Sequence, residues 1–179
     1  AEYLVEGRRE GAHVIEFNPI YVNIAHDSPC FAGYMPGNHV AEADVGLLVD
    51  VDVPWIPKFT PENPATFWAH IDIDVVKQAF PMWGFANNLR IAGDSCRILA
   101  QLLEELNARA TPGFRDAAAK RVAVLAKEHE ARMQDVAKLA ADRGAPGRIN
   151  PQYICAELGH ALAPEDILVN EAIRNNEMI

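Results

Sequence analysis

A series of short apolar runs, most of them ending in acidic residues, constrains the fold most. Val45 to Val51 (VGLLVDV) is a continuous apolar run, and Thr66 to Ile73 (TFWAHIDI) and Leu89 to Gly93 follow it. Continuous apolar runs of this length are typical of strands buried on both faces of a parallel sheet. His13 to Phe17 (HVIEF) predicts a further short strand. We therefore expect a mainly parallel sheet in about the first 108 residues.

Helical patterns alternate with these strands. Residues 1–10 indicate the end of a helix, and a second helix follows Asp94 or Ser95, either of which can cap its first turn. Residues 107–114 predict a linker, and apolar residues at helical spacing then predict a long amphipathic helix that ends near Arg143. Strands that alternate with helices favour an α/β domain.

The end of the chain predicts one more helix and one more strand. Asn150-Pro151 combines a capping residue with proline at the first helical position, and Pro164 ends the helix. Asp166 to Asn170 (DILVN) predicts a strand. Such a strand needs a partner, because a lone strand is not stable by itself.

Composition excludes several classes of protein. The chain has 16 basic and 25 acidic side chains, a net charge of −9, and 3 cysteines. This acidic balance argues against nucleic acid and against an anionic membrane surface as partners. No apolar run is long enough to span a bilayer, and the first residues do not resemble a secretory signal, so we expect a cytoplasmic protein. The cysteines are too few and too widely spaced for a disulfide framework or a metal knuckle.

Acidic residues gather where the predicted strands end. Asp50 and Asp52 end one strand, Asp72 and Asp74 the next, and Asp94 follows the last. Ligands of open α/β sheets bind at this edge, where a carboxylate can accept hydrogen bonds from a ribose. The same oxygens can ligate a divalent cation. The structural alternative is that these carboxylates cap helices, close turns or face solvent, and the sequence leaves the three interpretations open.

Other candidate chemistry is weaker. The chain contains no glycine-rich phosphate loop, no nucleophile elbow and no closely spaced histidine pair among its 6 histidines. His26-Asp27 offers a remote hydrolase hypothesis, against which a loop histidine bonded to its neighbours is the simpler interpretation. Trp55, Trp68 and Trp83 predict either an aromatic pocket or, more simply, a packed interface.

Several motifs together resemble one enzyme family. The chain resembles the thiamine diphosphate-dependent enzymes related to acetolactate synthase and benzoylformate decarboxylase in four motifs. These are HIDID at His70 to Asp74, the acid-terminated strand before it, Gly93-Asp94 at the start of an LLxxL helix, and the closing ILVNEAIRN. The stretches DVDVPWIP and HIDIDVVKQAFPMW are most similar to the acetolactate synthase-like branch. The order and spacing of these short motifs carry the resemblance.

The resemblance implies a domain organisation. Residues 1–108 would form the central α/β domain, a Rossmann-like parallel sheet of the DHS-like NAD/FAD-binding type that lacks its usual first strand. Residues 109–147 would form a helical connector, and residues 148–179 the beginning of the diphosphate-binding C-terminal domain. The chain would then be a fragment whose partners are the N- and C-terminal domains of its parent, which assembles as a homodimer or homotetramer.

The resemblance also implies cofactors. The parent would decarboxylate or ligate 2-oxo acids with thiamine diphosphate and Mg²⁺, whereas the fragment would lack the activating glutamate and the metal-binding motif and be inactive, with no catalytic or metal-binding residue of its own. Glu171 and Arg174 correspond to a loop that approaches the diphosphate or the substrate.

The resemblance further bears on nucleotide binding. Asp72 and Asp94 match positions that touch the adenosine of ADP or FAD in nucleotide-binding members of the family. The carboxylates of Asp50 and Asp52 replace the glycine and arginine of FAD-binding relatives and would repel a pyrophosphate, which argues against FAD. The alternative function is a nucleotide-binding or purely structural α/β module that serves oligomer assembly.

Overall fold

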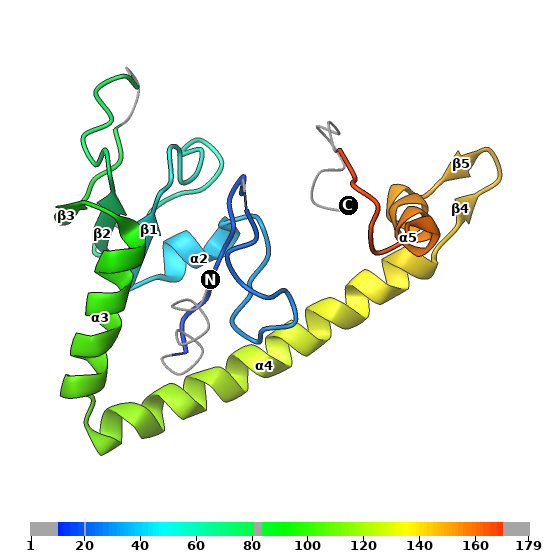
Figure 1. Cartoon of the computed structure of the whole chain (residues 1–179). Helices are drawn as coiled ribbons and strands as arrows, with labels where there is room; N and C mark the ends of the chain where they lie inside the picture. Colours follow the sequence, from blue (N-terminus) through cyan, green and yellow to red (C-terminus); the bar gives the residue numbers. More distant parts are fainter. Residues whose placement is uncertain (1–10, 20, 81–83, 170–179) are drawn as a thin grey trace. The chain divides into compact units, whose positions relative to one another are not determined.

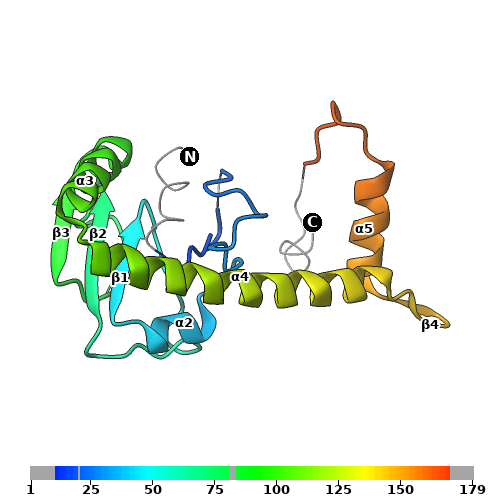
Figure 2. The same cartoon turned by 90° about the horizontal axis from the view of Figure 1, so that it is seen from below.

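The computed structural model describes residues 11–19, 21–80 and 84–169 and divides the chain into two compact units, residues 1–126 and 127–179. In the first unit, strands β1 (Val45–Val49), β2 (Phe67–Asp72) and β3 (Leu89–Ala92) form a parallel sheet in the order β1-β2-β3 (Figure 1). Helices α2 (Gly37–Glu42) and α3 (Ser95–Arg109) flank it (Figure 2). The predicted α/β class and parallel sheet are confirmed for the described residues.

The register of the sheet sorts its side chains onto two faces. Val45 pairs with Phe67, Leu48 with His70, and Ile71 with Ile91. Trp68, His70 and Asp72 therefore share one face of β2, because successive side chains of a strand alternate between faces. That face meets a core cluster to which α2, β1 and two loops contribute, and whose members are Val40, Leu48, Trp55, Trp68 and Phe85.

The expectation that the first strand is buried on both faces is wrong. Val45 is 66% exposed and Leu47 is 43% exposed. These two side chains lie on the face opposite the Trp68 cluster, where Phe67 of the central strand β2 is also 44% exposed, so the exposure belongs to this face and not to the edge position of β1. An apolar run alone does not show whether both faces of a strand are covered.

Two further strand predictions are also wrong. His13 to Phe17 forms only an isolated parallel bridge between Val14 and Phe31, because its partner is a loop that turns at Gly33 (φ +94°) and does not extend the ladder. Residues 166–169 form no strand, consistent with the absence of a pairing strand among the described residues. The predicted helix over 1–10 lies outside the described residues, as does Asn170.

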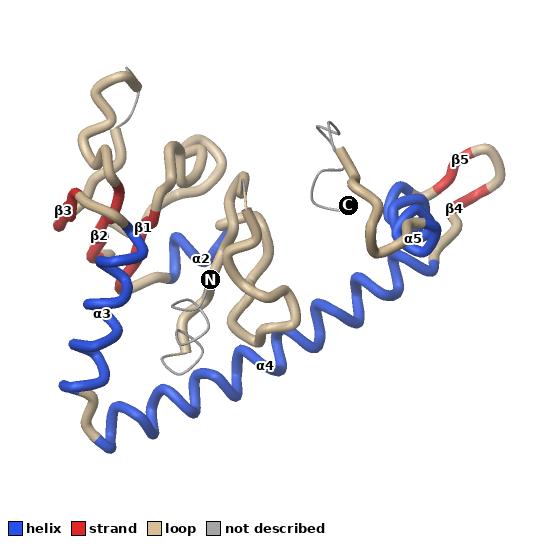
Figure 3. The backbone as a smooth tube through the Cα atoms, in the orientation of Figure 1, coloured by secondary structure: helices blue, strands red, loops and turns tan. Residues whose placement is uncertain are grey.

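The helix predictions are largely confirmed. Helix α3 begins after Asp94, as expected, but none of its residues is fully buried. The linker is shorter than predicted, because α3 continues to Arg109 and α4 (Pro112–Ala141) begins at Pro112. Proline fits this first helical position because the amide it lacks has no partner inside the helix. Loops occupy much of the remaining first unit (Figure 3).

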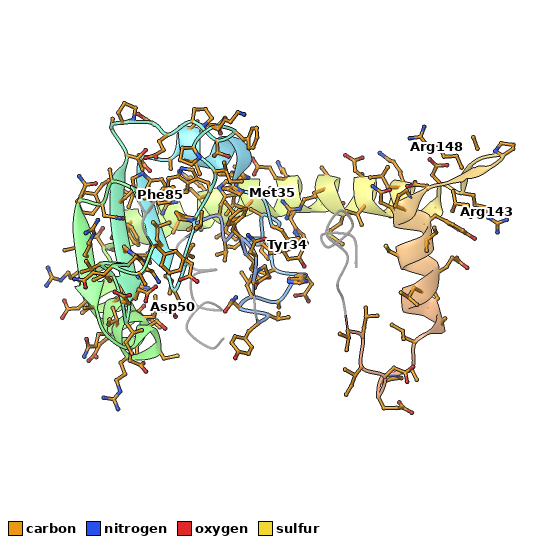
Figure 4. The ribbon with its side chains drawn as sticks, turned by 90° about the horizontal axis from the view of Figure 1, so that it is seen from above. Tyr34, Met35, Asp50, Phe85, Arg143 and Arg148 are labelled. Carbon is orange, nitrogen blue, oxygen red and sulfur yellow. The ribbon has the colours of Figure 1, made fainter. Side chains whose placement is uncertain are left out.

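The second unit has little interior. It contains the end of α4, an antiparallel pair of two-residue strands, β4 (Gly144–Ala145) and β5 (Arg148–Ile149), and helix α5 (Pro151–Ala161). As predicted, Asn150 caps α5, and its side chain accepts a hydrogen bond from the Gln152 amide. No described residue from 127 to 169 is buried. In Figure 4 the labelled Arg143 belongs to this unit, where its guanidinium lies over the Tyr153 ring at 5.5 Å.

Candidate functional site

The carboxyl edge of the sheet gathers the acidic residues that the sequence singled out. Asp72 is the last residue of β2, and Asp50 follows β1 and donates its amide to the Ile71 carbonyl at 3.0 Å. Asp50 is labelled beside β1 in Figure 4. The Gly93 amide donates to the Asp72 carbonyl at 3.0 Å, which brings Asp94 to the same edge. The predicted convergence of these residues is therefore present.

A lysine connects the ends of two strands. The Lys77 ammonium lies 2.7 Å from Asp72 Oδ2 and 2.9 Å from Asp52 Oδ1. The Lys77 and Asp72 side chains are each 6% exposed, whereas Asp52 is 67% exposed. We call these three residues, Asp52, Asp72 and Lys77, the lysine clasp. One cation thus joins a buried carboxylate at the end of β2 to an exposed carboxylate after β1.

The turn after β2 places this lysine. The Asp74 amide donates to Asp72 Oδ1 at 2.8 Å, and the Lys77 amide donates to Asp74 Oδ1 at 3.1 Å. Lys77 has φ +51°, in the left-handed region that residues with a Cβ rarely adopt. Short aspartate side chains stabilise such turns by bonding to backbone amides nearby. The HIDID sequence thereby folds the chain back so that the lysine reaches Asp72.

Electrostatics hold the clasp in its charged form. Burial alone would raise the pKa of Asp72, but hydrogen bonds from Lys77 and the Asp74 amide, together with the lysine charge, place it below the ordinary value. Burial would lower the pKa of Lys77, but its bonds to Asp72 and Asp52 and their charges place it above the ordinary value. Both groups are therefore ionised at neutral pH.

A buried histidine lies on the same face of β2. His70 is fully buried, and its Nε2 is 3.6 Å from Asp72 Oδ2. Burial, opposed by Asp72 and reinforced by the positive charges of Lys77 and Arg90, lowers the pKa of His70. The imidazole is therefore neutral at pH 7, which suits a buried position beside an ion pair.

The clasp limits which ligand Asp72 can bind. Its Oδ1 accepts from the Asp74 amide and its Oδ2 from Lys77, so each oxygen has an internal partner. Each oxygen can accept a second hydrogen bond, but the side chain is only 6% exposed, so little of it is accessible to a ribose hydroxyl or a cation. No group of three or more His, Cys, Asp or Glu residues suited to a metal ion occurs among the described residues. The arrangement favours the structural interpretation of Asp72, and ribose recognition stays a prediction.

Asp94, Glu171 and Arg174 are the other residues predicted to bind a cofactor. Asp94 is the N-cap of α3, where its Oδ1 accepts from the Arg97 amide at 2.9 Å, so the capping interpretation is confirmed for this residue. Capping does not test the predicted adenosine contact. Glu171 and Arg174 lie outside the described residues.

A second buried carboxylate organises the loop before α2. Glu16 is 4% exposed, and its Oε1 accepts from the amides of Asn23 and Ile24. Its Oε2 lies 2.9 Å from His26 Nε2, and His26 Nδ1 lies 3.5 Å from the Tyr34 hydroxyl. The His26 ring also stacks on Phe31 with centroids 4.3 Å apart. Glu16, His26 and Tyr34 therefore form a connected polar series, the Glu16 cluster.

The Glu16 cluster resembles a catalytic triad only in its connectivity. Burial and the Glu16 charge raise the pKa of Tyr34, so the phenol stays protonated and is a poor nucleophile. The carboxylate bound to His26 is Glu16, which the His26-Asp27 hypothesis did not identify. The cluster is better suited to ordering the loop than to hydrolysis.

The tryptophans pack in the core. Trp55 and Trp68 are 2% and 7% exposed, and their ring centroids lie 4.9 Å apart. Phe85, labelled in Figure 4, meets Trp55 edge-on at 5.2 Å. These two tryptophans are packed as expected, but in the core of the first unit and not at a subdomain interface, while Trp83 lies outside the described residues.

Sequence reasoning missed Lys77, Glu16 and Tyr34. A lone lysine after a strand and a glutamate inside an apolar run carry no spacing signal, because their partners come from distant segments. The only available signal was the run of aspartates in HIDID, which suggests a bonded turn.

No family model, curated protein or solved structure matches the chain. Among the described residues, no helix is both long and apolar enough to cross a bilayer.

Proposed function

We propose that this chain forms part of a thiamine diphosphate-dependent 2-oxo acid decarboxylase or carboligase, contributing the central α/β domain and the start of the diphosphate-binding domain. One observation carries the proposal: HIDID ends a parallel strand at the carboxyl edge of the sheet, and Gly93-Asp94 leads the neighbouring strand directly into a capped helix. These are the positions that the family resemblance assigns to the two motifs. Three parallel strands in consecutive order also fit a Rossmann-like sheet of the DHS-like type.

The second unit supports the domain organisation. Its described part contains regular elements but no buried residue, and exposes Met133, Ile154 and Leu158. Elements without an interior need further surface to cover them, because burial of apolar area is the main favourable term in folding. This fits residues 148–179 as the beginning of a larger domain.

The chain's own residues supply architecture rather than chemistry. Thiamine diphosphate would act as the electron sink for decarboxylation. The described residues include no group of three or more His, Cys, Asp or Glu that could hold Mg²⁺, and we derive no catalytic step from them. Their part is to hold the ends of β1 and β2 through the lysine clasp. The proposal also includes cofactor contacts by Glu171 and Arg174, assembly as a homodimer or homotetramer, and a cytoplasmic location.

The test compares this chain with the complete reading frame that encodes it. Purified full-length protein is expected to release CO₂ from pyruvate or benzoylformate only when thiamine diphosphate and Mg²⁺ are both present. Arg174→Met should raise the cofactor concentration needed for half-maximal rate, whereas Arg148→Met should not. The 179-residue chain alone should be silent. Turnover by that chain, or a full-length protein indifferent to thiamine diphosphate across a panel of 2-oxo acids, contradicts the proposal.

The structural alternative is favoured over nucleotide binding by the internal partners of both Asp72 oxygens. A ligand that prefers the folded state raises the melting temperature. Millimolar ADP or FAD should therefore leave the melting temperature unchanged if the module is purely structural. A rise that disappears in Asp72→Ala would establish nucleotide binding instead.

A further inference from the structure

Two histidines from distant segments meet on the first unit. The rings of His13 and His39 have centroids 4.3 Å apart and planes tilted by 43°. His13 precedes the bridge residue Val14, and His39 lies in α2. Their separation in sequence gives no ligand spacing, so the pair emerges only in the folded chain.

Backbone contacts hold both histidines in place. The Val14 amide donates to the Cys30 carbonyl, and the Ala32 amide donates to the Val14 carbonyl, each at 2.8 Å. On the other side, the His39 amide donates to the Pro36 carbonyl at 3.0 Å, and its neighbour Val40 is 4% exposed in the core. A site whose ligands are held by the fold loses little entropy on binding.

We propose that His13 and His39 together bind a late first-row divalent metal ion, with Zn²⁺ as the representative. Two imidazole nitrogens on one tetrahedral Zn²⁺, each at about 2.0 Å, lie roughly 3.3 Å from each other. On such an ion the two ring centroids lie roughly 5 Å apart. The observed 4.3 Å separation therefore opens on binding, through side-chain rotations that turn one nitrogen of each ring toward the ion. Each ring binds through one nitrogen and keeps the other for a neighbouring group, the usual arrangement of metal-bound histidines.

The ligand set defines the selectivity. Imidazole suits Zn²⁺, Ni²⁺ and Cu²⁺, whereas Mg²⁺ and Ca²⁺ prefer oxygen ligands. Among the described residues, no third His, Cys, Asp or Glu joins the pair, so the proposal assigns two protein ligands only. The bound ion joins the segment around Val14 to α2. It stabilises the folded chain, because the unfolded chain does not hold the two imidazoles together.

The test measures the melting temperature of the metal-free full chain. Cys96→Ser and Cys155→Ser are included throughout, because accessible thiols also bind Zn²⁺. Zn²⁺ and Ni²⁺ should each raise the melting temperature in a saturable way, and Mg²⁺ should not. His13→Ala and His39→Ala should each abolish the rise, whereas His160→Ala, at an 81% exposed side chain, should keep it.

A spectroscopic measurement covers the case in which a variant does not fold. In NMR spectra of the chain that keeps both histidines, added Zn²⁺ should shift the ring proton resonances of His13 and His39 together. The proposal is overturned if Zn²⁺ does not change the melting temperature, or if the rise persists in both histidine variants. It is also overturned if Zn²⁺ shifts only the resonances of other histidines.

Discussion

The Lys77 ammonium lies 2.7 Å from Asp72 Oδ2, and each of the two side chains is 6% exposed. A buried carboxylate left without its cation is costly, because water cannot replace the missing partner. Lys77→Met should therefore lower the free energy of unfolding by about 3 kcal/mol. Urea denaturation measures this change. Lys138→Met removes a cation from a pair whose side chains are 74% and 70% exposed, and should cost less than about 1 kcal/mol. Equal effects of the two substitutions would argue against a stabilising clasp.

The clasp also predicts a pH profile. The lowered pKa of Asp72 makes its contribution complete above the ordinary value of 3.8, and the contribution is lost as the pH falls through the folded pKa. The raised pKa of Lys77 makes its contribution complete below 10.5, and the contribution is lost as the pH rises through the folded pKa. The difference in unfolding free energy between the native chain and Lys77→Met should thus be largest between these limits. It should shrink in acid from the pH at which Asp72 of the variant takes up a proton, because burial without the lysine raises the pKa of that carboxyl. A difference that stays constant in acid would show that the charge of Asp72 does not govern it.

Sequence patterns predicted where several helices and strands lie but not which of their side chains are buried. Two helix starts were predicted from capping residues that precede an apolar helical pattern, Asp94 for one and Asn150-Pro151 for the other. This works because capping depends on residues adjacent in sequence. The exposure of Val45 and Leu47 was not predictable, since it depends on which elements cover that face of the sheet.

In the candidate sites, too, features set by the local sequence were predicted and contacts between distant segments were not. Convergence of Asp72 and Asp94 at one edge followed from parallel strands, whereas the cation that binds Asp72 did not. Glu16 was hidden within an apolar run, and its partners His26 and Tyr34 are brought to it by a loop without a repeating pattern. Contacts between distant segments are set by tertiary packing, which spacing rules do not encode.

Glu16 provides a third prediction through its effect on Tyr34. Burial and the Glu16 charge both raise the pKa of Tyr34. Glu16→Gln removes the charge, so the pKa of Tyr34 should fall toward the ordinary value of 10.0. The tyrosinate absorbance of each chain, after subtraction of the matching Tyr34→Phe variant, isolates this phenol. Glu105→Gln, which alters an exposed carboxylate, is the control and should leave the Tyr34 titration unchanged. An unaltered titration in Glu16→Gln would show that burial alone raises the pKa.

The contact between Gly46 and Trp68 gives the last prediction. A Cβ on Gly46 would overlap three carbons of the Trp68 ring, Cε3, Cζ3 and Cη2. Trp68 is 7% exposed and packs on Trp55, so the ring has little room to move away. Overpacking of this kind typically costs about 1–3 kcal/mol, and Gly46→Ala should lower the unfolding free energy by that amount. At Gly113 in α4 nothing lies within 4 Å of the added carbon, so Gly113→Ala should be neutral or stabilising. Urea denaturation of both variants, with tryptophan fluorescence as the probe, distinguishes a steric clash from a general effect of adding a methyl group. A Gly46→Ala chain as stable as Gly113→Ala would mean that Trp68 does not pack against β1 at this position.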